Sequence, residues 1–84
     1  MSWQVEILPR ALKALGRIPE PGHSALRKAM VSLAEQPRPA GCKKLSGREG
    51  WRLRCGDYRI VYEIADKVRI VTVLDVGHRR DIYR

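Results

Sequence analysis

Apolar and polar positions divide the first half of the chain into one strand and two helices. Residues 3–8 alternate with the period of two that is typical of a half-buried strand. Residues 10–17 carry apolar side chains at helical spacing, and a Pro-rich break follows them. A second helical stripe begins at His23 or Ser24 and stops at Pro37. Together these patterns predict a strand followed by a helical hairpin.

The second half predicts a loop and three strands. Residues 37–50 are basic and rich in glycine, which indicates a loop. Residues 51–55 and 58–64 are two alternating runs separated by a Gly-Asp pair, a strong signal for a hairpin with a type II′ turn. After another short turn, the β-branched run 68–76 predicts a central strand.

The order of elements predicts an α+β fold, strand-helix-helix-three-strand, in a single domain over residues 1–84. Short turns between the last three strands require antiparallel neighbours, so the sheet should be mainly antiparallel. A helical hairpin can cover only one face of that sheet. We therefore expect the opposite face to be open to a ligand.

Charge indicates the kind of ligand. The 84 residues include 17 Lys and Arg against 9 Asp and Glu, which gives a net charge of +8. Such a surface favours a polyanion: nucleic acid first, then an acidic protein, then an anionic membrane.

The cysteines and the N-terminus indicate the compartment. Cys42 and Cys55 form neither a CxxC pair nor a disulfide scaffold, so a reduced cytosol is expected. The first residues lack the pattern of a signal peptide, and no apolar stretch is long enough to span a bilayer. We expect a cytoplasmic protein without a membrane partner.

The predicted hairpin gathers arginines on one face of the sheet. Its register places Arg54 opposite Arg59, with Arg52 one step away on the same face. Like charges directly opposite each other are unfavourable, so an anion between them would explain the arrangement. The planar forks of arginine suit phosphate oxygens. Alternatively, the three side chains splay into solvent or pair with Glu63 and Asp75.

The tail adds a second cluster directly after the central strand. If the strand ends beside the arginines, His78, Arg79 and Tyr83 would add an imidazole, a cation and a phenol to the same site. Alternatively, His78 is a surface residue, and Ile82 with Tyr83 caps the core.

Three segments carry a resemblance to a known family: KLSG at 44–47, WRLRCGDYRIVYEI at 51–64 and VLDVGHRRDIYR at 73–84. On this layout they resemble the RelE/ParE toxin superfamily, and its RelE branch in particular, over essentially the whole chain. The resemblance implies the toxin of a toxin–antitoxin pair, an endoribonuclease that enters the ribosomal A site and cuts the messenger RNA there. Its implied partners are a cognate antitoxin, mRNA and ribosomal RNA.

The resemblance also implies a chemistry: the RNA 2′-hydroxyl attacks the adjacent phosphate, with no metal and no cofactor. By resemblance the site falls on Arg52, Arg54, Arg59, Arg79 and Tyr83. The arginines would neutralise the charge of the transition state, and Tyr83 would stack on or orient the splayed nucleotide. Backbone phosphates or ribosomal RNA would be held by Lys43, Lys44, Arg48 and Arg80.

The proton acceptor is less well defined. RelE-like enzymes often carry lysines on the first hairpin strand, where this chain has Arg52 and Arg54. Arginine does not readily act as a base, because its pKa lies above about 12. His78 is the best candidate in the sequence, with the ribosome or water as alternatives. Catalysis could also be largely positional and electrostatic.

Regulation should come from the antitoxin. Some relatives have a further C-terminal helix that moves on inhibition, but this sequence ends at Arg84, so we do not expect that device. An acidic or amphipathic antitoxin segment should instead wrap the domain and neutralise or distort its basic face.

Two other functions are compatible with the same fold. The first is a ParE-like inhibitor of DNA gyrase, and the second is a non-catalytic nucleic-acid-binding homologue. Metal-dependent hydrolysis is disfavoured, because His23, His78 and two separated cysteines offer no ligand spacing.

Overall fold

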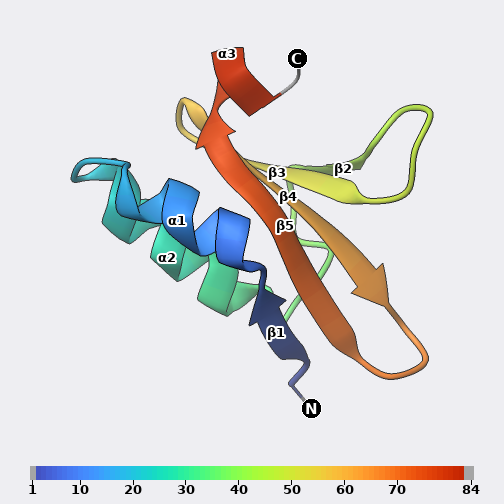
Figure 1. The fold of residues 1–84 in the computed structure, drawn as a ribbon. Coiled ribbons are helices and arrows are strands. Elements are labelled where there is room, and N and C mark those ends of the chain that lie inside the picture. The colour runs from blue at the N-terminus through green and yellow to red at the C-terminus, as the bar shows by residue number, and fades with distance from the viewer. Residues whose placement is uncertain (1, 83–84) are drawn as a thin grey trace.

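The computed structural model describes residues 2–82 of the chain. Its elements, in order, are β1 (Gln4–Ile7), α1 (Pro9–Gly16), α2 (Gly22–Ser32), β2 (Cys42–Lys44), β3 (Trp51–Cys55), β4 (Tyr58–Ala65), β5 (Ile70–His78) and α3 (Arg79–Ile82). The strands form one sheet in the order β1-β5-β4-β3-β2, and α1 and α2 lie together on one side of it (Figure 1). The predicted α+β architecture is confirmed.

Strand pairing follows the turn lengths. The pairs β2–β3, β3–β4 and β4–β5 are antiparallel, whereas β1 pairs with β5 in parallel, which is possible because no short turn joins these two strands. β5 lies between β1 and β4, which confirms it as an interior strand. It begins two residues later than predicted, because Arg69 adopts a left-handed φ of 58° within the preceding turn.

The prediction of an uninterrupted loop over residues 37–50 is wrong. Residues Cys42–Lys44 form β2, which pairs with β3 so that Cys42 lies opposite Leu53. Three residues are too few to show an alternating pattern, but they satisfy backbone groups along the outer edge of β3. At the end of the loop, Gly50 has a φ of 119°, and a Cβ there would lie 3.2 Å from the carbonyl oxygen of Tyr62.

The two long helices begin slightly earlier than predicted. α1 starts at Pro9, whose fixed φ suits the first turn and whose missing N–H costs nothing there. α2 starts at Gly22, so neither His23 nor Ser24 is its N-cap. Ser24 instead donates two hydrogen bonds to the carboxylate of Glu20, from its backbone N–H at 3.0 Å and from its hydroxyl at 2.7 Å.

The core lies between these helices and the inner face of the sheet. Its largest fully buried side chains are Tyr62, Leu26, Leu33, Ile60, Val71 and Val73. The hydroxyl of Tyr62 donates a hydrogen bond of 2.7 Å to the carbonyl of Pro37, and burial raises the pKa of this phenol. No helix within residues 2–82 is long and apolar enough to cross a membrane.

Candidate nucleic-acid interface

Arginines and a lysine gather on the face of the sheet that α1 and α2 leave uncovered. Arg54 lies directly opposite Arg59, and Arg52 lies opposite Lys43 of β2. Their neighbours Leu53 and Ile60 point to the other side and are buried in the core. We call Lys43, Arg52, Arg54 and Arg59 the basic face.

Arg59 is the most unusual member of the basic face because only 6% of its surface is exposed. Its Nη1 donates to the carbonyl oxygens of Gly56 at 3.0 Å and of Tyr58 at 2.9 Å, both at the β3–β4 turn. Its Nε is buried and has no hydrogen-bond partner. A buried donor on a cation is costly to leave unsatisfied, so a shift of the side chain that brings this nitrogen to an acceptor such as a phosphate oxygen would be favourable.

The other arginines of the basic face differ in exposure. Arg54 is exposed, whereas Arg52 is half-buried. Asp75, one of the carboxylates expected as an alternative partner, forms its ion pair with Arg10 of α1 at 3.1 Å. Asp75 therefore has a cationic partner on α1.

A cleft continues the basic face toward α3. It has a volume of about 650 Å³ and lies between the β2–β3 hairpin and α3. Its lining includes the cations Lys43, Lys44, Arg48 and Arg52, together with the apolar side chains of Leu45 and Ile82. The structure thus brings together three of the four predicted RNA-binding cations, and it joins them to Arg52.

The tail returns to the same end of the sheet. The backbone N–H of Arg79 donates to the carbonyl of Asp57 in the β3–β4 turn at 2.9 Å, which fixes the start of α3 beside that turn. Gly77 is the strand partner of Arg59, and a Cβ on it would lie 3.7 Å from Ile82. Arg79 and Arg80 are exposed on α3. Tyr83 lies outside the described residues.

His78 is placed on the other side of the sheet from the basic face. It lies opposite Tyr58, and the two rings meet edge to face with centroids 5.8 Å apart. Its Nδ1 accepts a hydrogen bond of 3.2 Å from the backbone N–H of Arg80. The neutral ring therefore carries its proton on Nε2 and caps the first turn of α3. The structure does not bring this imidazole together with the arginines.

The contributions of Leu45 and Ile82 were not predicted as part of a site. The sequence pattern gives Ile82 only a core-capping role, and Leu45 lies in a segment expected to be a loop. Neither position carries a local signal, because the cleft exists only once α3 and β2 are both placed. Within the described part of the chain, no three His, Cys, Asp or Glu side chains are grouped as metal ligands would be.

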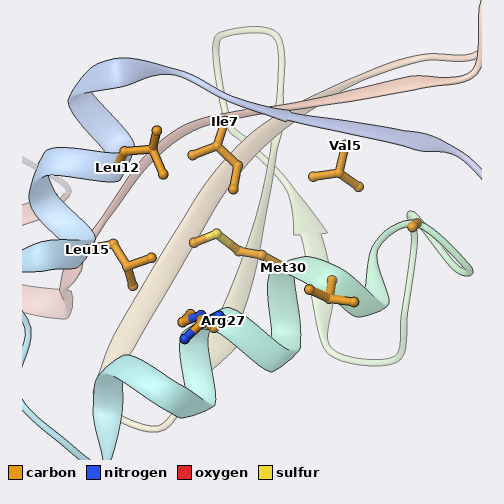
Figure 2. A pocket seen from close by; sticks show the side chains of 8 residues that line it. Val5, Ile7, Leu12, Leu15, Arg27 and Met30 are labelled. Atoms are coloured by element: carbon orange, nitrogen blue, oxygen red, sulfur yellow. The ribbon is translucent and has the colours of Figure 1, made fainter.

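A different surface lies on the helical side of the sheet. An apolar groove of about 400 Å³ lies among β1, α1 and α2. Val5, Ile7, Leu15 and Met30 lie along it (Figure 2). Arg27 supplies its cationic side chain. We call this surface the helical groove.

Comparison with known proteins identifies the family. A sequence profile described as "ParE toxin of type II toxin-antitoxin system, parDE" matches residues 5–83. The chain belongs to this family. The expected resemblance to the RelE/ParE superfamily is confirmed.

Within this family, the chain is similar to RelE proteins. The chain is 32% identical over 82 residues to the "mRNA interferase toxin RelE" of Escherichia coli K12, covering 94% of this chain and 85% of that protein. Its fold matches a chain of the RelBE2 toxin–antitoxin complex of Mycobacterium tuberculosis with a TM-score of 0.83 and 26% identity, covering 94% and 100% of the two chains. The archaeal RelE–RelB complex of Pyrococcus horikoshii gives a TM-score of 0.83 and 26% identity, with 96% and 99% covered.

Proposed function

We propose that this protein cuts mRNA in the ribosomal A site and that its basic face holds the phosphodiester to be broken. Family membership and the identity to RelE make the chain an mRNA-cleaving toxin of a toxin–antitoxin pair. The dependence on the ribosome, the residues and the chemistry are our proposal.

The pairing of Arg54 with Arg59 carries the assignment of the site. Two cations face each other across β3 and β4, and one of them has a buried N–H without an acceptor. A phosphodiester would relieve the repulsion and supply that acceptor at the same time. The arrangement thus has a free-energy cost in the free protein, and binding of the phosphodiester would remove that cost.

In the proposed reaction the RNA 2′-oxygen attacks the adjacent phosphorus. The P–O2′ bond forms, the P–O5′ bond breaks, and the products are a 2′,3′-cyclic phosphate and a 5′-hydroxyl. The 2′-hydroxyl loses its proton, and the leaving 5′-oxygen gains one. Negative charge builds up on the phosphoryl oxygens, where Arg54, Arg59 and Arg79 would stabilise it.

Proton transfer is the step to which this chain contributes least. Arg52 and Arg54 do not readily act as bases, and His78 lies on the other side of the sheet with its Nδ1 occupied by the N–H of Arg80. We therefore propose that alignment and charge neutralisation provide most of the catalysis, with water or the ribosome accepting the proton. Tyr83, by resemblance, would stack on a base of the substrate.

The antitoxin is the partner that would control this activity. Similar solved structures are complexes of RelE-like toxins with their antitoxins. In this chain the helical groove combines an apolar floor with the cation of Arg27, and Leu12, which also lines the groove, is 52% exposed. We propose that an amphipathic, acidic segment of the antitoxin lies in this groove, since the chain carries a net charge of +8.

Primer-extension mapping of a translated message tests the proposal. Purified protein should create new 5′ ends within A-site codons on ribosome-bound mRNA, and Arg54→Ala should remove them. Arg17→Ala, which removes one exposed arginine from the helical side, should cleave like wild type. Inhibition of DNA gyrase without any new RNA end would instead favour the ParE-like alternative.

A further inference from the structure

The cleft beside the basic face combines two surface chemistries that a phosphate site alone does not need. Four cations line it, as expected for an RNA backbone, but Leu45 and Ile82 present aliphatic side chains to the same space. Both side chains are half-buried and come from different elements, the β2–β3 loop and α3. Aliphatic walls among cations suit a ligand with an uncharged flat part and an anionic part.

The volume of the cleft fits such a ligand. At about 650 Å³ it lies within the range of roughly 300–1,000 Å³ that is usual for small-molecule sites. A nucleotide has an apolar base face and an anionic phosphate. Single-stranded RNA is commonly recognised through bases that are splayed out of the stack.

The position of the cleft relates it to the scissile phosphate. Lys43 and Arg52 are opposite each other on β2 and β3 and belong both to the cleft and to the basic face. Arg54 lies two residues further along β3 on the same side of the sheet. A nucleotide in the cleft would therefore be a close neighbour of the phosphate held by Arg54 and Arg59.

From these observations we propose that the cleft holds one unpaired nucleobase of the RNA between Leu45 and Ile82, and that it thereby determines which phosphate is cut. This inference rests on the proposed function of the basic face and assigns the adjoining subsite. The apolar walls select by shape and contact area, while the hydroxyl of Ser46, also in the lining, offers the base edge one neutral hydrogen-bonding group.

Binding of matched oligoribonucleotides tests the subsite directly. The probe is a short single-stranded oligoribonucleotide with 2′-O-methyl riboses, which cannot be cut. In each member of a matched set of probes, one base is replaced by an abasic residue. All probes carry the same phosphates, so the cations contribute equally. Wild type should bind the intact probe about tenfold more tightly than the probe that lacks the critical base.

Two variants locate that preference in the cleft. Leu45→Ala and Ile82→Ala come from different elements, so either one decides the matter if the other fails to fold. Each should lose most of the preference for the intact probe while binding the abasic probe as wild type does. Val68→Ala removes an exposed branched side chain from the turn before β5 and should keep the full preference.

The outcomes separate this inference from the proposed function. Equal binding of intact and abasic probes by wild type, or an undiminished preference in both variants, would overturn the subsite even if the protein cleaves translated mRNA. A clear preference in a protein that cuts no message would overturn the proposed function and leave the subsite standing. In the cleavage map, both variants should also broaden the set of cut positions.

Discussion

The two faces of the same sheet show how adjacent residues take opposite roles. On β3 and β4, Leu53 and Ile60 point toward the helices and are buried in an apolar core. Arg54 and Arg59, one residue away, point to the uncovered face and confront each other as like charges. Burial of the apolar side chains on the inner face stabilises the fold, whereas the outer face places two like charges opposite each other, an arrangement that a bound anion would favour.

The largest expected effect comes from removing an arginine from the basic face on the outer side of the sheet. Arg54→Ala should reduce cleavage of translated mRNA by roughly 100-fold or more, as the loss of a transition-state donor typically does. Because Arg54 is exposed, the thermal midpoint of the variant should stay within a few degrees of the wild-type value. Single-turnover cleavage and a thermal melt measure the two effects; retained activity would contradict the assignment of Arg54.

Arg59 sharpens this comparison because it is both charged and buried. Arg59→Met keeps much of the side-chain volume but removes the donors to the carbonyls of Gly56 and Tyr58. We expect a similar loss of cleavage together with a measurable loss of stability. If Arg59→Met folds stably and still cuts, the buried guanidinium is not needed for the chemistry.

Truncating a side chain on the inner face should have the opposite effect, a loss of stability with little loss of cleavage. Ile60 is fully buried, and Ile60→Ala should lower the free energy of unfolding by roughly 2–5 kcal/mol through the cavity it leaves. Cleavage per folded molecule should remain close to that of wild type, since the side chain points away from the basic face. Urea unfolding and active-site titration check both parts, and a selective loss of activity in folded protein would be the contrary result.

Sequence patterns predict the inner face better than the outer one. The alternation of Leu53, Ile60 and Tyr62 determines which side is buried, and the structure agrees. The opposition of Arg54 and Arg59 follows from the Gly-Asp turn alone, and Gly56 has the positive φ of 62° that a type II′ turn requires. These features are local, so short-range reasoning is enough.

Features that depend on distant segments were not predicted. β2 exists because the edge of β3 offers it a partner, and the side of the sheet on which His78 lies depends on its register with β4. Neither of these can be read from the pattern of a single segment, because each requires two elements to be placed.

His78 tests a smaller difference between the faces. Because its Nδ1 accepts the Arg80 N–H on the side away from the basic face, His78→Gln should change the cleavage rate and its pH profile only slightly. Glutamine keeps an acceptor for the same N–H. A large loss of rate, or a clearly altered pH profile, would restore the imidazole as the base.

The smallest effect concerns the contact that joins residues 37–41 to the sheet. Arg38 forms a bidentate ion pair with Asp66 at 3.0 and 3.1 Å, lies 5.1 Å from the ring centroid of Trp51, and lowers the pKa of Asp66. Since folding lowers this pKa, the stabilisation is present above the ordinary pKa of an aspartate and is lost as the pH falls through the lowered value. Arg38→Gln should therefore reduce the acid sensitivity of the urea midpoint slightly, whereas Arg17→Gln should not. An unchanged acid limb in Arg38→Gln would mean that the pair contributes nothing measurable.

The central claim is that a phosphodiester binds at Arg59, and NMR of arginine Nε–H groups tests it most directly. Labelled protein would be titrated with the uncleavable oligoribonucleotide while the side-chain resonances are followed. We predict that the Nε–H of Arg59 shifts strongly downfield as it gains an acceptor and that its shift saturates together with that of Arg54. Saturable RNA binding that leaves the Arg59 Nε–H unchanged would contradict the account.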